Sequence, residues 1–222
     1  MTITYHEEVT QGSDEWLALR CGLLTASEMK LIVTPTFKAA SNDKEKAHLY
    51  ELLGQRITKY VEPRYIGDDM LRGLNDEIEA LALYEKNYAK VKRIGFMTND
   101  KFGFIIGYSP DGLVGDDGQV ECKSRAAKFQ VQTIIDGIIP PEFMIQLQTG
   151  LLVSERKWVD FVSYSGGLPM FVLRCYPIET VQDAIIAAAQ NFELRLSEKL
   201  EAYLNASNGM IQTERKIEVQ MF

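Results

Sequence analysis

The stretch that follows Pro110 carries the residues of this sequence that could do chemistry. Asp111 and Glu121 can supply carboxylate oxygens, which are the ligands that Mg²⁺ prefers. Lys123 comes two residues after Glu121, so both side chains point to the same face of an extended strand. Two anionic ligands beside a cation are the minimum needed to bind a metal, activate a water and hold a phosphodiester. The alternative is an Asp-Gly turn followed by a solvated surface pair.

The composition limits which metal ions such a site could hold. The chain has two histidines and three widely spaced cysteines, with no Cys-x-x-Cys pair. Neither a zinc knuckle nor an iron–sulfur site is indicated. A catalytic metal must therefore be held mainly by carboxylates, which favours Mg²⁺ or Mn²⁺ over zinc.

A third acidic residue is placed by a predicted helix over about 68–88. Leu74, Ile78 and Leu81 form the expected buried stripe of this helix. Glu77 lies at the edge of that stripe, where a carboxylate is costly unless it is paired or bound to a metal. We expect Glu77 to be a functional acid, and the alternative is a glutamate paired with an arginine at the edge of the core.

Two amides lie in an otherwise apolar helix predicted from 142 to about 153. Gln146 and Gln148 must find hydrogen-bond partners if this helix buries them. Either both are satisfied core groups, or one of them reaches the candidate site.

A possible anion site lies near the N-terminus. Residues 13–33 are predicted to form two short helices, the second opening with a capping box from Thr25 to Glu28. A helix N-terminus that bears the Ser27 hydroxyl, with Arg20 just upstream, could bind an anion. From spacing alone, a plain helix cap and a surface arginine are favoured over this anion site.

Hydrophobic patterns predict the remaining elements. The segment over 111–123, which carries Asp111, Glu121 and Lys123 and is called the acidic hairpin below, is expected to continue a sheet begun by two earlier strands. A single domain is expected over 1–222, with a helical part at about 10–90, a catalytic sheet core at about 91–176, and a C-terminal helix and tail at about 179–222. The further predicted helices lie at 43–60, 124–136 (in part loop) and 179–205, and the strands at 91–97, 103–106, 158–163 and 170–176.

The net charge of −7 argues against a protein that coats DNA with its whole surface, because nonspecific binding requires phosphate neutralisation. A basic groove with metal ions inside an acidic exterior remains compatible with DNA as substrate. No apolar run approaches the roughly 20 residues of a membrane span, and the first residues lack the features of a signal peptide. The expected location is the cytoplasm, without membrane partners.

The order of these motifs resembles a known nuclease family. Pro110-Asp111 followed by Glu121-Cys122-Lys123 is similar to the Pro-Asp…(Asp/Glu)-x-Lys signature of restriction-endonuclease-like nucleases. The pattern Trp-x-x-x-Arg-x-Gly-x-x-Thr-Ala-Ser over 16–27 resembles the opening motif of the phage lambda-type, or alkaline, exonucleases, the viral recombinase nucleases. Three further stretches match the same family in order, and the resemblance runs from about residue 10 to 165: 73–77, 109–113 and 146–148.

The resemblance implies an α/β (α+β) fold with a restriction-endonuclease-like core, in which helices flank a mixed central sheet. It also implies a processive exonuclease that digests linear double-stranded DNA from 5′-phosphorylated ends. Such an enzyme leaves 3′ single-stranded tails for phage-type homologous recombination. Family members thread DNA through a homotrimeric ring and work with a single-strand annealing protein. The expected setting is a bacterial host cell, with the chain encoded by a phage or prophage.

Carried over residue by residue, the resemblance makes Asp111 and Glu121 metal ligands, with the Cys122 backbone carbonyl as a third. It implies two Mg²⁺ ions per site, for which Mn²⁺ can substitute. Lys123 would position the attacking water or stabilise charge on the phosphorane. Glu77 would help to hold the second metal or orient its waters.

The resemblance also assigns residues around the DNA end. Gln146 would orient the nucleophile or a carboxylate. Arg20 and Ser27 would bind the terminal 5′-phosphate. Met70 aligns with an apolar wedge that separates the strands, although it could equally be a core residue.

Two alternative functions remain. One is an endonuclease or DNA-repair nuclease on the same fold, which would cleave a covalently closed circle. The other is a noncatalytic DNA-binding module, which would be expected if Asp111, Glu121 or Lys123 were missing. All three residues are present.

Overall fold

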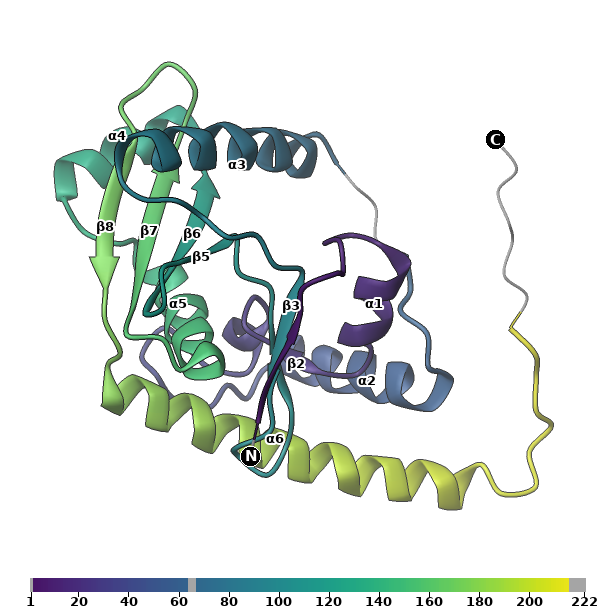
Figure 1. The fold of residues 1–222 in the computed structure, drawn as a ribbon. Coiled ribbons are helices and arrows are strands. Elements are labelled where there is room, and N and C mark those ends of the chain that lie inside the picture. The colour runs from purple at the N-terminus through teal and green to yellow at the C-terminus, as the bar shows by residue number, and fades with distance from the viewer. Residues whose placement is uncertain (1, 64–66, 216–222) are drawn as a thin grey trace, which may run out of the picture.

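Two four-stranded sheets lie at the centre of the part of the chain that the structure describes, residues 2–63 and 67–215 (Figure 1). The structure is a computed structural model. The strand orders are β1-β3-β4-β2 and β5-β6-β7-β8. Both sheets are mixed, because β2 pairs in parallel with β4 and β6 with β7, whereas the other pairs are antiparallel. The strands are β1 (Ile3–His6), β2 (Leu24–Thr25), β3 (Phe96–Asn99), β4 (Ile106–Tyr108), β5 (Gly112–Val114), β6 (Gly118–Ser124), β7 (Trp158–Tyr164) and β8 (Phe171–Cys175).

Six α-helices flank these sheets within the described residues. The helices predicted at 43–60, 68–88, 142–153 and 179–205 are confirmed, with ends that differ by no more than two residues. The segment expected as helix and loop at 124–136 forms a helix in its second part. The helices are α1 (Asp14–Arg20), α2 (Asp43–Thr58), α3 (Asp68–Asn87), α4 (Ala127–Asp136), α5 (Pro141–Ser154) and α6 (Glu179–Ala206), and Met29–Leu31 form a 3₁₀ helix, η1.

The acidic hairpin belongs to the second sheet, so the prediction that it continues the first sheet is wrong. The chain leaves the first sheet at Tyr108 and enters the second at Gly112. Pro110 lies in this connection, and a proline has no amide hydrogen with which to continue a ladder. β6 then pairs in parallel with β7 over its whole length, which holds the hairpin in the second sheet. The connection over 109–111 therefore lies at the junction of the two sheets.

The strands expected at 91–97 and 103–106 begin later in the sequence, as β3 and β4. Lys92 forms only an isolated β-bridge among the described residues. Asn99, which lies beyond the end of the strand predicted at 91–97, is the last residue of β3, and its buried amide donates to the Val153 carbonyl (3.1 Å). This contact with α5 satisfies a polar side chain inside the fold, so the strand extends into residues that would otherwise turn.

The second helix predicted within 13–33 does not form. Thr25 is the last residue of the short strand β2, which pairs with β4, and η1 follows. The Thr25 hydroxyl donates to the Glu28 carboxylate (2.9 Å), so these two residues contact each other through their side chains. Pairing with a strand distant in sequence has prevailed over a local capping signal.

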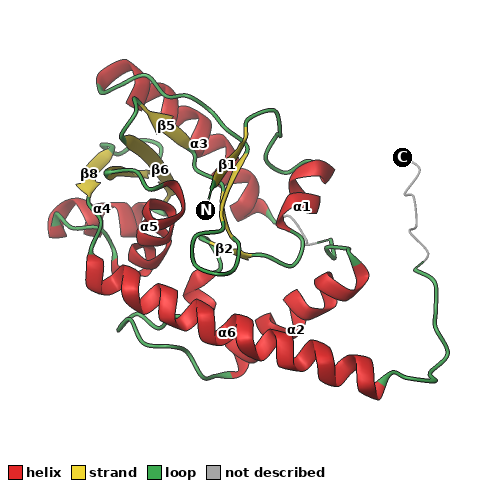
Figure 2. Cartoon of the chain, turned by 60° about the horizontal axis from the view of Figure 1, so that its bottom comes forward, coloured by secondary structure: helices red, strands yellow, loops and turns green. Residues whose placement is uncertain are grey.

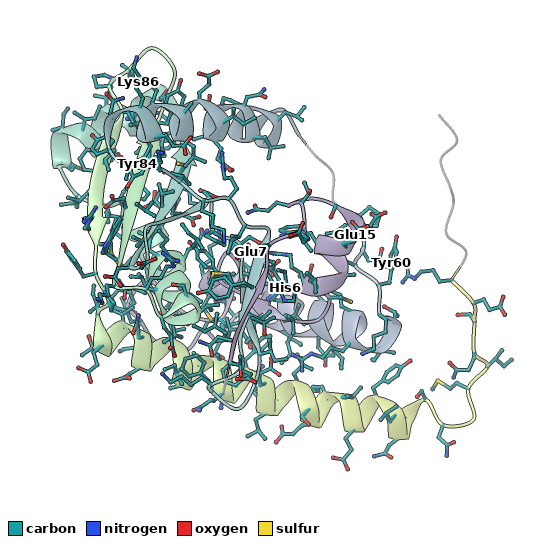
Figure 3. The ribbon with its side chains drawn as sticks, viewed as in Figure 1. His6, Glu7, Glu15, Tyr60, Tyr84 and Lys86 are labelled. Carbon is teal, nitrogen blue, oxygen red and sulfur yellow. The ribbon has the colours of Figure 1, made fainter. Side chains whose placement is uncertain are left out.

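The buried stripe of α3 also differs from the prediction. Leu81 is buried, but Leu74 and Ile78 are 56% and 62% exposed. The helix instead buries Ala80 and Tyr84 against the second sheet, because it is rotated about its axis relative to the predicted orientation. Figure 3 shows Tyr84 on the side of α3 that faces the sheet.

The long helix α6 runs along the bottom of the molecule in Figure 1, while α3 crosses the top. Figure 2 brings α6 forward and shows α2 beside it. Two ion pairs join these helices, Arg56 with Glu193 (2.6 Å) and Arg195 with Glu45 (2.7 Å).

The largest apolar cluster lies among α2, α5, α6 and the first sheet, and a second cluster lies between α3 and β6. Within 2–63 and 67–215, no helix combines the length and hydropathy needed to span a bilayer.

Candidate active site

The strand β6 presents its functional side chains on one face and its apolar side chains on the other. Val120 and Cys122 pack into the cluster beneath α3. Glu121 and Lys123 alternate with them and point to the opposite face. The Lys123 ammonium donates to Oε1 of Glu121 (2.7 Å). This arrangement agrees with the same-face placement expected from the Glu-x-Lys spacing.

Asp111 is tied to β6 from the junction between the sheets. Its side chain is buried, and its Oδ2 accepts a hydrogen bond from the Cys122 backbone amide (2.6 Å). Burial raises the pKa of Asp111 well above its usual value, and the nearby charges of Glu121 and Glu77 raise it further. The structure thus crowds three carboxyl groups into one electrostatic neighbourhood.

The Glu121 carboxylate accepts hydrogen bonds from three side chains. Lys123 and Gln146 both donate to Oε1, and the Tyr108 hydroxyl donates to Oε2 (2.9 Å). Burial and the adjacent Glu121 raise the pKa of Tyr108 well above its usual value, so its hydroxyl remains a donor. A buried carboxylate with this many donors is held in one orientation.

The two glutamines of α5, Gln146 and Gln148, have different hydrogen-bond partners. Gln146 reaches Glu121, whereas Gln148 donates to the Tyr176 carbonyl and accepts from the Ile178 amide, both at 2.8 Å. Gln148 therefore anchors the segment between β8 and α6, and Gln146 is the amide that reaches the candidate site.

Glu77 is paired with an arginine, which is one of the two roles that the sequence left open. Its carboxylate accepts from Arg93 (3.3 Å), and the same guanidinium nitrogen of Arg93 also donates to the Asp111 carbonyl (2.8 Å). Burial raises the pKa of Glu77, while Arg93 acts in the opposite direction. Glu77 is thus paired with an arginine and lies within electrostatic range of Asp111 and Glu121.

The donor set fits Mg²⁺. The described residues contain no group of three or more histidine, cysteine, aspartate or glutamate side chains arranged to hold a metal by themselves. Asp111 and Glu121 supply hard oxygens, and Mg²⁺ normally completes its shell with waters and few carboxylates. Burying mutually repelling carboxyl groups is unfavourable, and a divalent cation would offset that cost.

A cavity of about 190 Å³ joins this acidic cluster to the candidate anion site. A larger cavity, of about 440 Å³, lies between α2 and α6, and none of the predicted site residues lines it. The smaller cavity is lined by Gln11, Trp16, Arg20, Ala26, Ser27, Tyr108, Ser109, Asp111, Glu121, Lys123 and Gln146.

The Arg20 side chain is held in place at one end of this cavity. Its guanidinium stacks over the Trp16 ring (4.3 Å to the centroid) and donates to the Thr25 hydroxyl (3.2 Å). Ser27 lies close by, with its oxygen 3.4 Å from that of Thr25. Because no α-helix begins at Thr25, a bound anion would be held by side chains, and the predicted helix N-terminus does not contribute.

Five residues lining the cavity were not named as site residues from the sequence: Gln11, Trp16, Ala26, Tyr108 and Ser109. Trp16 donates through its indole nitrogen to the Ser109 hydroxyl (2.8 Å), and Gln11 donates to the Pro110 carbonyl (3.0 Å). Tyr108 contacts Glu121, as described above. Trp16, Ala26 and Ser109 lie in stretches that match the family, and Tyr108 directly precedes one of these stretches. Gln11 had no signal in the sequence.

Met70 lies in the first turn of α3. Its side chain lies outside the part of the chain that the structure describes, so the strand-separating wedge stays a prediction.

Residues 15–157 match the YqaJ-like viral recombinase domain. The chain belongs to this family. The matched region contains all the predicted site residues whose side chains the structure describes: Arg20, Ser27, Glu77, those of the acidic hairpin, and Gln146. A comparison with curated proteins gave no match.

Solved structures agree with this assignment. The YqaJ-like chain is similar to the crystal structure of an alkaline exonuclease, LHK-Exo, from Laribacter hongkongensis, with 29% identity and a TM-score of 0.79 over 90% of this chain and 100% of that chain. The complex of LHK-Exo with dAMP gives 30% identity with the same TM-score and coverage. A phage-related exonuclease from Haemophilus somnus 129PT shares the fold at 14% identity, with a TM-score of 0.53 over 80% of this chain and 96% of that chain.

The predicted resemblance and the restriction-endonuclease-like fold class are thereby confirmed, with two mixed sheets in place of one central sheet. Membership of the YqaJ-like family, with its similarity to an alkaline exonuclease, supports a deoxyribonuclease that has a role in recombination.

Proposed function

We propose that this chain is a Mg²⁺-dependent, processive 5′-to-3′ exonuclease on linear double-stranded DNA, which leaves 3′ single-stranded tails for recombination by annealing. One observation carries the proposal: a single cavity is lined both by the acidic residues and by Arg20 and Ser27. A terminal phosphate bound near Arg20 would bring the adjoining phosphodiester toward Asp111 and Glu121. An enzyme that cleaves only internal bonds has no need of such a phosphate site.

Asp111 and Glu121 would hold the metal, with the Cys122 carbonyl and Glu77 as further groups for a two-ion site in which Mn²⁺ can replace Mg²⁺. When bound, the metal would supply an activated water and neutralise charge on the leaving oxygen. The crowded carboxyl groups described above support this assignment.

Lys123 supplies fixed positive charge beside the acidic residues. Burial lowers the pKa of this ammonium group, but the Glu121 and Asp111 carboxylates raise it, and the net shift is upward. Lys123 is therefore protonated at neutral pH and acts as a cation that stabilises developing negative charge, not as a general base. Gln146 of α5 donates to the same oxygen of Glu121 that accepts from Lys123.

Arg20 and Ser27 would bind the 5′-phosphate of the DNA end. The stacking of Arg20 on Trp16 pre-orients the guanidinium, which lowers the ordering cost of binding an anion. The related alkaline exonuclease has been crystallised with dAMP, a nucleotide that carries one phosphate. By that similarity, a terminal nucleotide is the group that we expect in the cavity.

The decisive experiment uses end-labelled linear duplexes and a covalently closed circle, each incubated with Mg²⁺. We expect digestion of the 5′ strand from 5′-phosphorylated ends, slower digestion from 5′-hydroxyl ends, and an intact circle. Cleavage of the circle would favour the alternative of an endonuclease or repair nuclease. No hydrolysis of any substrate would favour a noncatalytic DNA-binding module.

Processivity is proposed to come from enclosure of DNA by a ring of three subunits, with an annealing protein receiving the 3′ tail. A net charge of −7 suits enclosure, because an acidic exterior repels DNA and confines it to one path. Sedimentation should report three subunits per particle. A monomer at micromolar concentration would contradict the ring.

A further inference from the structure

Tyr108 connects the two halves of the proposed active site. It is the last residue of β4 in the first sheet, and its hydroxyl donates to Glu121 of β6 in the second sheet (2.9 Å). The next residue, Ser109, accepts a hydrogen bond from Trp16, on which Arg20 stacks. One short segment therefore contacts both the phosphate-binding half and the acidic half.

The ring of Tyr108 is fixed by packing. Tyr108 is 1% exposed. Gly150 of α5 lies against the ring so closely that a Cβ at that position would be 2.7 Å from Cζ of Tyr108. No side chain larger than hydrogen fits there without displacement of the ring, so the direction of the hydroxyl is set by the surrounding backbone.

The hydrogen bonds of Glu121 show what this hydroxyl does. Among the described residues, Oε1 accepts from Lys123 and Gln146, whereas Oε2 accepts from Tyr108. A carboxylate offers about four acceptor positions, two on each oxygen. Two donors fill the capacity of Oε1, and one position remains at Oε2.

We propose that Tyr108 is a positioning residue, which sets the rotation of the Glu121 carboxylate so that the remaining position of Oε2 is available to a divalent cation. This inference rests on the proposed function. Without the hydroxyl, Glu121 would still be held at Oε1 but could rotate about its terminal bond. The expected consequence is weaker metal binding, because groups that orient a metal ligand typically contribute about 10- to 100-fold to affinity.

The chain contains a matched control for the loss of this hydroxyl. Tyr84 is also buried, and its hydroxyl donates to Asp160 of the neighbouring strand β7 (2.6 Å). Tyr84 projects from α3 onto the face of the sheet opposite Glu121, and it does not line the cavity. Tyr84→Phe therefore removes a buried hydroxyl–carboxylate hydrogen bond without altering the proposed metal ligands.

The experiment compares Tyr108→Phe and Tyr84→Phe with the wild-type chain. Mg²⁺ binding is measured by calorimetry without DNA, exonuclease rate is measured against Mg²⁺ concentration, and thermal unfolding is followed in parallel. We expect Tyr108→Phe to weaken Mg²⁺ binding about tenfold or more, with most of the rate restored at saturating Mg²⁺. Tyr84→Phe should lower thermal stability and retain the wild-type Mg²⁺ affinity.

Gly150→Ala offers a second route to the same result, because it displaces the Tyr108 ring and its hydroxyl while the hydroxyl group itself is retained. This variant should also weaken Mg²⁺ binding, and it replaces Tyr108→Phe should that chain fail to fold. Wild-type Mg²⁺ affinity in Tyr108→Phe would overturn the positioning role while leaving the proposed function intact. A wild-type chain that neither binds Mg²⁺ nor requires it would instead overturn the proposed function itself.

Discussion

The guanidinium of Arg93 lies 3.3 Å from the Glu77 carboxylate and holds it toward the acidic residues of β6. The same nitrogen donates to the backbone carbonyl of Asp111 (2.8 Å), so Arg93 joins α3 to the junction between the sheets. Burial raises the pKa of Glu77 and Arg93 opposes that shift. The ionised form of Glu77 therefore depends on an arginine from outside the helix.

Replacing Arg93 by alanine should move the acidic limb of the pH–rate profile to higher pH. Without the guanidinium, burial is less opposed, so Glu77 must lose its proton at a higher pH before it can assist a metal. The rate is measured as a function of pH at saturating Mg²⁺. Lys92→Ala is the control, because Lys92 is exposed and pairs with Glu7 (2.7 Å). An unchanged acidic limb in Arg93→Ala would remove Glu77 from the reaction.

Asp111→Asn and Glu121→Gln should each abolish Mg²⁺-dependent digestion and leave the fold intact. Each amide replaces one hard anionic ligand with a neutral group that binds Mg²⁺ poorly. Digestion of labelled duplex gives the activity, and circular dichroism reports the fold. Asp117→Asn serves as the control from the same hairpin, because its carboxylate is exposed and pairs with Lys157. Substantial residual activity in either variant would remove that residue from the metal site.

Stabilisation of the chain by Mg²⁺ should increase with pH. The pKa of Asp111 is raised in the folded chain, chiefly by burial, so folding strengthens the binding of this proton. The protonated Asp111 carboxyl group contributes fully to stability at a pH below the pKa that Asp111 has in the unfolded chain. This contribution is lost as pH rises through the pKa that Asp111 has in the folded chain. Mg²⁺ must displace the proton, so its binding strengthens over the same interval. The check is the change in melting temperature on adding Mg²⁺ from acidic to basic pH; a shift independent of pH would contradict it.

Arg20→Ala should selectively reduce the preference for 5′-phosphorylated over 5′-hydroxyl ends. A hydrogen bond to a charged group contributes about 1.5–3 kcal/mol, so the preference should fall by at least about tenfold. Initial rates on the two duplexes, measured side by side, give the ratio. Ser27→Ala should reduce the same ratio to a smaller extent. If Arg20→Ala slows both substrates equally, the phosphate site lies elsewhere.

The two glutamines of α5 should separate activity from stability. Gln146→Ala should lower kcat with little change in melting temperature, because its amide supports the Glu121 carboxylate. Gln148→Ala should destabilise the chain by about 1–3 kcal/mol, since it leaves the Tyr176 carbonyl and the Ile178 amide without this partner. Chemical denaturation and steady-state kinetics on both variants provide the test. A loss of stability in Gln146→Ala together with a loss of activity in Gln148→Ala would contradict the roles assigned to the two residues.

Local patterns in the sequence were sufficient to predict much of this molecule. Helices such as α2 and α6 follow from apolar residues at helical spacing, because their periodicity is a property of the backbone itself. The placement of Glu121 and Lys123 on one face follows from the two-residue period of a strand. Pro110-Asp111 and Glu121-Cys122-Lys123, together with the pattern over 16–27 and the other matching stretches, were sufficient to indicate a resemblance to a nuclease family.

Other features depended on contacts between residues far apart in the sequence. β2 exists because Leu24 and Thr25 pair with β4, and the hairpin joins the second sheet because β6 pairs in parallel with β7. The exposure of Leu74 and Ile78 follows from how α3 packs on that sheet.

The structure likewise decided which partners surround each candidate residue. Arg93 beside Glu77, Tyr108 on Glu121, and the hydrogen bond from Trp16 to Ser109 each join separate segments of the fold. A parallel strand pair or a hydrogen bond between sheets leaves no periodic trace in the sequence. The sequence therefore determined the chemical types of the candidate residues, while tertiary packing determined the orientation and charge environment of each side chain.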